Sequence, residues 1–153
     1  MRLGIILIVA LLTWQTLSPN GMRSGKIATV KPSPREVHCL ATNIYHEARG
    51  EPVEGQIAVA QVTLNRLRHP SFAATLCGVV HEYKQFSWTL EKRKKIRDDV
   101  AWTGAIAIAT EVLSHPEDYS SFKALYYHTR QVRPYWSKTK RIAAVIGNHI
   151  FYY

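Results

Sequence analysis

Glu47 is the acidic residue best placed to do chemistry in this sequence. It follows Leu40 by seven positions and Ile44 by three, so at about 100° per residue of a helix it projects within roughly 20° of Leu40, on an apolar stripe. Burial and the negative carboxyl end of a helix both disfavour a further negative charge, so we expect the pKa of Glu47 to be raised. A carboxyl group that keeps its proton near neutral pH can act as a general acid.

The helix that must position Glu47 has clear signals at both ends. Ser33 is the expected N-cap, Pro34 the first helical residue, Glu36 completes a capping box and Gly50 stops the helix. At its end, Glu47 could also brace the structure by pairing with a neighbouring cation, for which the candidates are Arg49, Arg66 and Arg68.

Apolar periodicity predicts three more helices and a short extended part. The helices are expected from Pro52 to before His69, over about 72–83, and over 98–114, whereas residues 124–128 and 142–153 are rich in β-branched and aromatic side chains. The sequence therefore predicts an α+β fold, predominantly helical, as a single domain with a small extended or β part.

Length and charge bound the classes of function. A chain of 153 residues accommodates one compact domain, and 46% hydrophobic residues are enough for a true core. The formal net charge of +9 favours an anionic polymer as partner: nucleic acid, phospholipid head groups or a bacterial envelope.

The N-terminal residues 1–22 are typical of a signal peptide or a signal anchor. The apolar stretch at residues 3–17 would span only about 22 Å as a helix, against ~30 Å for the hydrocarbon layer of a membrane. Residues 23–33 are expected to be a linker, and residues 34–153 the catalytic domain. We therefore expect an exported or membrane-anchored protein of the periplasm or cell envelope, with membrane anchoring through residues 3–17.

Five blocks of sequence, in order, carry a family resemblance: YHEARGE at 45–51, GQIAVAQVTLNRLR at 55–68, CGVV at 77–80, QFSWT at 85–89 and GNHIFY at 147–152. Together they resemble the SleB-type cell-wall hydrolases, which cleave peptidoglycan. The resemblance implies a lysozyme-like fold and cleavage of the glycan between N-acetylmuramic acid and N-acetylglucosamine, commonly as a lytic transglycosylase. It also implies that Glu47 is the catalytic acid.

The sequence offers no obvious second catalytic carboxyl group. Ordinary glycosidases use two, one as acid and one as nucleophile or water activator. A lytic transglycosylase needs only one, because the muramyl 6-hydroxyl of the substrate attacks the anomeric carbon. We therefore expect transglycosylase chemistry, with a muramidase that hydrolyses the same bond as the alternative.

Two further segments are candidates for binding the sugar chain. Amide, hydroxyl and flat apolar side chains occur together at Gln85, Phe86, Ser87 and Trp88, and suit N-acetyl sugars, although a core strand would have the same pattern. Tyr126, Tyr127 and His128 match another block of the family (YYH) and could line the same groove or pack in the interior.

Cys39 and Cys77 are either one disulfide or two buried thiols. They occupy blocks in which exported relatives also carry cysteine, so an exported domain is expected to form the bridge. The histidines show no metal-ligand spacing, and we expect neither a metal nor another cofactor. The expected partner is the peptidoglycan glycan strand, bound by a monomer, with no nucleic acid.

Other functions remain open at this point. One is a metal-dependent wall amidase, and another is a basic module without enzymatic activity that binds the wall or a nucleic acid through cations such as those at 92–97. The biological setting is equally open between wall remodelling in a bacterium and host lysis by a phage endolysin.

Overall fold

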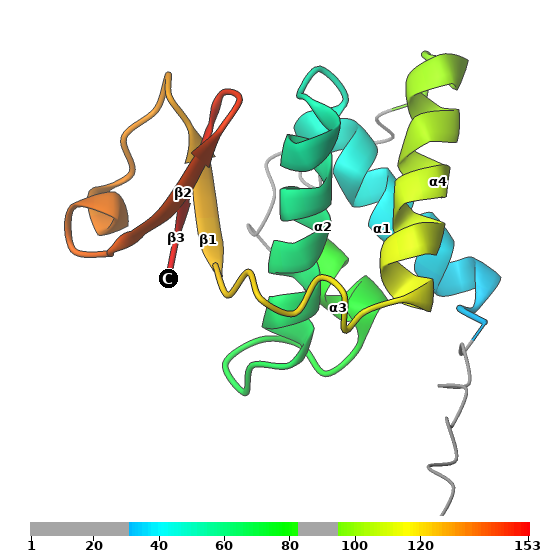
Figure 1. The fold of residues 1–153 in the computed structure, drawn as a ribbon, viewed down its shortest axis with the longest axis horizontal. Coiled ribbons are helices and arrows are strands. Elements are labelled where there is room, and N and C mark those ends of the chain that lie inside the picture. The colour runs from blue at the N-terminus through cyan, green and yellow to red at the C-terminus, as the bar shows by residue number, and fades with distance from the viewer. Residues whose placement is uncertain (1–30, 83–94) are drawn as a thin grey trace, which may run out of the picture.

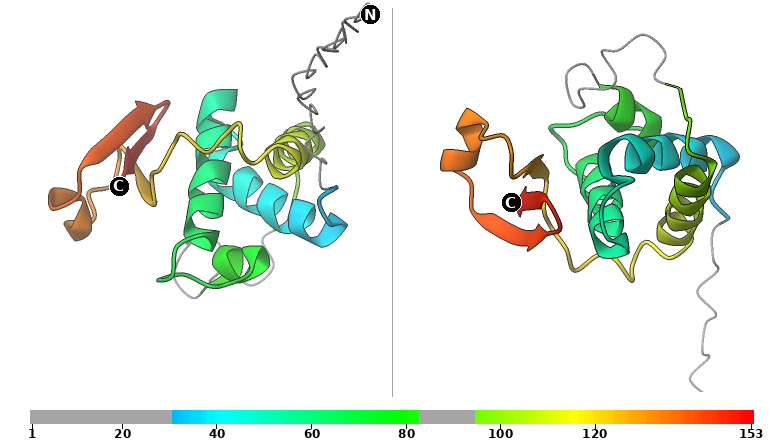
Figure 2. Two further views of the ribbon diagram at one scale, coloured as in Figure 1. Left: turned by 60° about the horizontal axis from the view of Figure 1, so that its bottom comes forward. Right: turned by 90° about the horizontal axis from the view of Figure 1, so that it is seen from above.

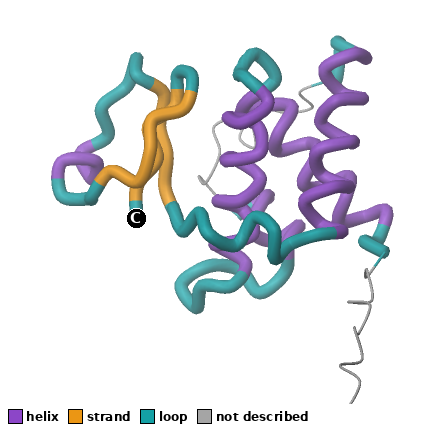
Figure 3. Tube along the Cα trace, in the orientation of Figure 1, coloured by secondary structure: helices purple, strands orange, loops and turns teal. Residues whose placement is uncertain are grey.

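The computed structural model describes residues 31–82 and 95–153. Four helices come first along the chain, and a three-stranded sheet follows (Figures 1 and 3). The elements are α1 (Pro34–Ala48), α2 (Val53–Leu67), α3 (Leu76–His81), α4 (Asp99–Ser114), β1 (Tyr126–Thr129), a 3₁₀ helix (Tyr135–Lys138), β2 (Ile142–Ile146) and β3 (His149–Tyr152). The predicted α+β class, mostly helical with a small sheet, is confirmed.

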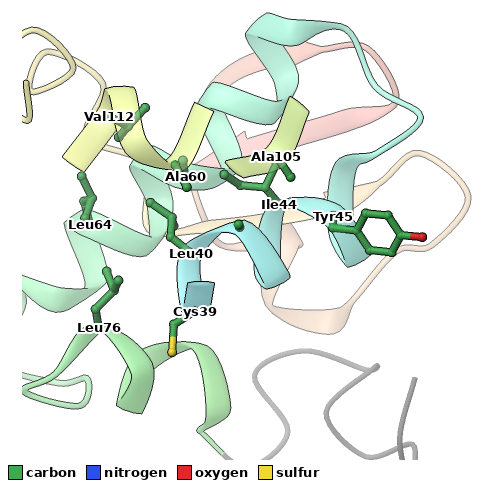
Figure 4. Packing of buried hydrophobic residues seen from close by; sticks show 11 residues of the cluster. Cys39, Leu40, Ile44, Tyr45, Ala60, Leu64, Leu76, Ala105 and Val112 are labelled. Carbon is green, nitrogen blue, oxygen red and sulfur yellow. The ribbon is translucent and has the colours of Figure 1, made fainter. Parts of the chain in front are cut away.

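Helix α1 is the centre of the helical layer, with α2, α3 and α4 packed around it (Figures 1 and 2). The predicted capping box at its start is confirmed, since the Ser33 side chain accepts from the Glu36 amide and the Glu36 carboxylate accepts from Ser33. The predicted apolar stripe forms the core shown in Figure 4, with Leu40 and Ile44 fully buried.

Tyr45 connects this core to the start of α4. Its ring is buried at 2% exposure, and its hydroxyl accepts hydrogen bonds from the backbone amides of Arg97 and Asp98, at 3.0 and 3.1 Å. Asp98 in turn caps α4 by accepting from the amide of Ala101 at 2.9 Å. The end of α1 near Tyr45 is therefore held both by the core and by the backbone at the start of α4.

The prediction of a helix over 72–83 was wrong at its start. Helix α3 begins only at Leu76, because the Thr75 side chain caps it by accepting from the amide of Gly78 at 3.1 Å. The preceding residues form turns after Pro70, in which the His69 ring accepts from the amide of Ser71. The predicted helix began too early, at Phe72, because apolar residues precede the cap at Thr75.

Cys39 and Cys77 form a disulfide that joins α1 to α3, with 5.4 Å between their Cα atoms. Cys39 is buried in the main core cluster, and Cys77 packs against it. The bridge closes a loop that contains all of α2, so it restricts the unfolded chain over a long segment.

The sheet is antiparallel, with strand order β1-β3-β2, and lies beside α2 (Figures 1 and 2). Its inner face, with Phe151 fully buried, packs on Val59 and Val62 of α2 and on Ala48 at the end of α1. Alternate residues of each strand therefore face either the helices or the outside. Within the described ranges, no helix is long and apolar enough to cross a membrane.

Several of the sequence-based expectations fall outside the described residues. These are the apolar segment 3–17 within the N-terminal residues 1–22, nearly all of the linker, and the sugar-binding candidates Gln85, Phe86, Ser87 and Trp88.

Removing the disulfide should lower the free energy of unfolding by about 3 to 4 kcal/mol, because a loop of this length is no longer closed in the unfolded chain. The double variant Cys39→Ser/Cys77→Ser is compared with the unreduced protein in urea unfolding followed by circular dichroism. Reductant should lower the midpoint of the wild type and leave that of the variant unchanged. Equal midpoints for oxidised and reduced wild type would contradict the assignment.

Candidate active site

Glu47 and Tyr127 meet at the junction of the helices and the sheet. The Tyr127 hydroxyl donates a hydrogen bond to Glu47 Oε2 at 3.1 Å, across 80 positions of sequence. Burial raises the pKa of the Tyr127 phenol well above its ordinary value, the charge of Glu47 raises it further, and the charge of Arg66 opposes the shift. The phenol therefore stays protonated at physiological pH and acts toward Glu47 as a donor.

Arg66 supplies a positive charge to the same junction. Its side chain is 5% exposed, and its Nε donates to the carbonyl of Leu125 at 2.8 Å. Burial lowers the pKa of this guanidinium, whereas Tyr127, Tyr126, Glu47 and Glu82 act to raise it. Glu47 therefore lies within the electrostatic reach of Arg66.

The other two arginines considered as partners of Glu47 lie elsewhere. Arg49 places its guanidinium over the ring of Tyr45, at 5.1 Å from the centroid, and Arg68 is exposed. Of the three candidates named from the sequence, Arg66 is thus the one that the fold brings into the site.

Helix α2 holds the segment that leads into β1. Asn65 Nδ2 donates to the carbonyl oxygens of Phe122 and Ala124, at 2.7 and 2.9 Å, next to the bond from Arg66 to Leu125. Three hydrogen bonds from two adjacent side chains therefore fix the backbone just before Tyr127. The position of the phenol is set by α2 as well as by its own strand.

Glu51 fixes the opposite end of the sheet. It lies in the corner between α1 and α2, and its carboxylate accepts from the backbone amide of Asn148 at 2.8 Å and from the Asn148 side chain at 3.2 Å. Gly147, next in the β2–β3 turn, has φ +56°, and a Cβ atom there would collide with Glu51 Oε2. The positive φ favours glycine at 147, and a side chain there would also displace the Glu51 carboxylate from Asn148.

His149 lies between these two contacts. It is 1% exposed, its ring meets the Tyr127 ring edge to face at 5.1 Å, and its Nδ1 is 3.9 Å from Glu51 Oε1. Burial lowers the pKa of His149 and His128 contributes in the same direction, whereas Glu51 opposes the shift. His149 thus packs behind the phenol that contacts Glu47.

Tyr126 and His128 lie on the outer face of β1, the face opposite to that of Tyr127. His128 Nε2 is 2.9 Å from the Tyr152 hydroxyl and its Nδ1 donates to the carbonyl of Thr129 at 2.8 Å, whereas Tyr126 packs between Phe72 and Trp136. Their predicted part in sugar binding stays a prediction. The sequence placed Tyr127 in the same family block as these two residues, but its contact with Glu47 was not foreseen; strand alternation turns it toward the helices when its neighbours face away.

Two other acids near the ends of α1 have partners of their own. Glu36 is bonded in the capping box and Glu51 to Asn148. Over the described ranges no group of three or more histidine, cysteine, aspartate or glutamate side chains could hold a metal ion.

The buried His149 predicts a dependence of stability on pH. Unfolded, the ring takes up a proton near pH 6.5, whereas its folded pKa is lower, so its contribution is complete above pH 6.5 and is lost as the pH falls toward the folded pKa. Between pH 7.5 and pH 5.5, the free energy of unfolding measured in urea should fall less for His149→Asn than for the wild type. His38→Asn, at an exposed histidine, is the control; an unchanged loss in His149→Asn would contradict the assignment.

Comparison with known proteins places most of this chain in a family. Residues 50–152 match the family described as cell wall hydrolase. The spore cortex-lytic enzyme of Oceanobacillus iheyensis is 36% identical over 122 residues, which are 78% of this chain and 42% of that protein. The spore cortex-lytic enzyme of Bacillus subtilis is 32% identical over 120 residues, or 78% of this chain and 38% of that protein.

Two solved structures are similar to the structure of this chain. The catalytic domain of the Bacillus cereus SleB protein superposes with a TM-score of 0.63 at 28% identity, covering 85% of this chain and 99% of that one. The catalytic domain of SleB from Bacillus anthracis, a germination-specific lytic transglycosylase, gives 0.63 at 29%, covering 80% and 97%.

The match to the full-length relatives is partial, since the aligned part spans about two fifths of the spore cortex-lytic enzymes. The superposition on the two solved catalytic domains nevertheless covers nearly the whole of each of them. The family match covers the segment from Gly50 to Tyr152, which includes Arg66 and Tyr127. The chain therefore belongs to the cell wall hydrolase family.

Proposed function

We propose that this protein cleaves the glycan of peptidoglycan between N-acetylmuramic acid and N-acetylglucosamine, as a lytic transglycosylase with Glu47 as its single acid and base. The observation that carries the proposal is the hydrogen bond that holds Glu47 at the end of α1 against Tyr127. The similarity to the catalytic domain of a germination-specific lytic transglycosylase supports it.

The proposed reaction has two proton transfers through one carboxyl group. Glu47 first gives its proton to the glycosidic oxygen as the bond from that oxygen to the anomeric carbon of the muramic acid breaks. The oxygen of the muramyl 6-hydroxyl then forms the new bond to the anomeric carbon, and its proton passes to Glu47. The acid is regenerated, and the product ends in a 1,6-anhydro ring.

Tyr127 serves this chemistry by orienting Glu47. Its hydroxyl donates to Oε2, so the carboxyl group delivers its proton from Oε1, and the bond strengthens when Glu47 becomes negative after the first transfer. Arg66 favours the same charged state through its buried guanidinium. The two groups thus stabilise the carboxylate that forms after the first transfer, whereas the half-buried position of Glu47 at the end of α1 favours the protonated acid that starts the reaction.

The second candidate function is that of a muramidase, which hydrolyses the same bond. It is favoured by the presence of a second carboxyl group, that of Glu82, near Arg66. Glu82, like Glu47, acts to raise the pKa of Arg66, although its effect is the smaller of the two. Glycosidases that hydrolyse the bond use such a pair. Glu51 does not fill this place, because its carboxylate is bonded to Asn148.

The cellular setting that we propose is the bacterial envelope, reached by export through residues 1–22, where peptidoglycan is the partner. Wall remodelling fits a disulfide-linked domain of this kind, since disulfides persist outside the cytoplasm. Lysis of a host by a phage endolysin is the alternative setting, and membrane anchoring or cleavage of residues 1–22 would be decided by sequencing the N-terminus of the mature protein.

Replacing the proposed acid tests the reaction directly. Glu47→Gln should lower the turnover of purified sacculi by at least about a thousandfold, because the proposed general acid is removed, and should leave the circular dichroism spectrum unchanged. Mass spectrometry of the wild-type digest should show 1,6-anhydromuramic ends. Reducing ends alone would favour the muramidase, and retained turnover in the variant would contradict the role of Glu47.

Removing only the hydroxyl of Tyr127 tests the orienting role. Tyr127→Phe should lower kcat about 10- to 100-fold, as expected for loss of one hydrogen bond to a charged group, while the ring keeps its packing. Tyr135→Phe is the control, since Tyr135 is an exposed tyrosine of the same layer that has no proposed contact with Glu47 or the sugar. Equal rates for the two variants would show that the bond to Glu47 has no part in turnover.

A further inference from the structure

The charged side chains in the C-terminal part of the chain are all cationic. From Tyr119 to Tyr153 there is no aspartate or glutamate, whereas six basic residues occur: Lys123, Arg130, Arg133, Lys138, Lys140 and Arg141. These residues belong to the sheet and its connections, so the sheet carries a large share of the net charge of +9. A charge of one sign on one layer favours a ligand of the opposite sign.

A hollow of about 390 Å³ lies within this cationic part. Its lining residues are His128, Arg130, Val132, Arg133, Val145 and Ile150, none of which is acidic. The floor follows the strand register, because His128 pairs with Ile150 and Ile150 pairs with Val145, which makes one row across the three strands. We call this hollow the outer-face pocket.

The outer-face pocket combines two charges with an apolar surface. Arg130 and Arg133 are exposed, and so are Val132 and Val145, at 51% and 50%. Guanidinium groups bind carboxylates through paired hydrogen bonds, and exposed valines favour small apolar side chains. The pocket therefore suits a short peptide that carries carboxylates and methyl groups, more than it suits a neutral sugar.

Peptidoglycan carries such a peptide on its muramic acid, the sugar next to the bond proposed above. The stem peptide attached to muramic acid is short, is rich in alanine and bears free carboxylates. We propose that the outer-face pocket binds the stem peptide of the substrate strand, with Arg130 and Arg133 on its carboxylates. This assignment rests on the proposed function and names a second point of contact for the same substrate.

Strand β1 connects the two points of contact. It is an edge strand, with Tyr127 on the inner face against Glu47 and His128, the next residue, on the outer face in the pocket. Adjacent Cα atoms are about 3.8 Å apart, and four extended residues reach about 13 to 14 Å. A stem peptide can therefore pass over this edge from a muramic acid at Glu47 into the pocket.

The test measures binding apart from catalysis. The peptide L-Ala-γ-D-Glu-meso-diaminopimelate-D-Ala is titrated into the Glu47→Gln protein and followed by NMR shifts, beside the same peptide with its carboxylates amidated. Saturable shifts at Ile150 and Val145 are expected for the acidic peptide alone. Arg130→Ala/Arg133→Ala should weaken this binding at least about tenfold, as for loss of a charge-assisted hydrogen bond.

A matched control separates the pocket from charge in general. Lys123→Ala/Lys138→Ala removes two cations of the same layer that do not line the pocket, and it should keep the wild-type affinity. Equal weakening in both double variants would overturn the proposal in favour of a diffuse attraction to polyanions. The proposal would also be overturned if the amidated peptide bound equally well. It would be overturned, too, if the acidic peptide did not bind the Glu47→Gln protein in which both arginines are intact.

Turnover then distinguishes failure of this proposal from failure of the proposed function. With Glu47 restored, Arg130→Ala/Arg133→Ala should raise KM on peptide-bearing strands and leave the rate on strands stripped of peptide by an amidase unchanged. An equal loss on both substrates would overturn the peptide assignment while leaving the cleavage reaction intact. Absence of cleavage in the wild type would reject the proposed function without touching the peptide titration.

Discussion

The site depends on holding a small sheet in a fixed register against the ends of two helices. A carboxyl group from the end of α1 meets a phenol from β1, and a shift of one residue in the strand would turn that phenol to the other face. Polar side chains, rather than apolar packing alone, fix the register. Asn65 and Arg66 bind the backbone that enters β1, and Glu51 binds the turn between β2 and β3.

These polar contacts give position more than stability. A buried guanidinium, a buried amide and a buried imidazole each lose hydration, and their hydrogen bonds only partly offset that cost. Apolar side chains at Arg66 or His149 would fill the same space without directing a neighbour. We therefore interpret the polar junction as the means by which a site is placed accurately on a sheet of only three short strands.

The helices could be predicted from the sequence because their signals are local. Ser33, Pro34 and Glu36 lie within four residues, and the stripe through Leu40 and Ile44 needs only the helical period. Glu47 was found in the same way, as an acid on an apolar face. The start of α3 was misjudged since the cap at Thr75 competes with an apolar pattern that begins earlier.

The partners of Glu47 could not be found by local reasoning. Tyr127 lies 80 positions away, and the bonds from Asn65 to Phe122 and Ala124 cross almost 60. Such contacts follow from the docking of the sheet, which no short window of sequence contains. Alternation along β1 would have shown that Tyr127 faces the helices, but not which residue it meets there.

Strand order has a consequence for the biosynthesis of the enzyme. The order β1-β3-β2 places the strand that leaves the ribosome last in the middle of the sheet, so neither of its neighbours has a partner until it has emerged. The acid on α1 is synthesised early, yet the phenol that orients it has no sheet to hold it during most of translation. A nascent chain therefore carries the acid that we propose as catalytic for some time before the phenol can hold it in place.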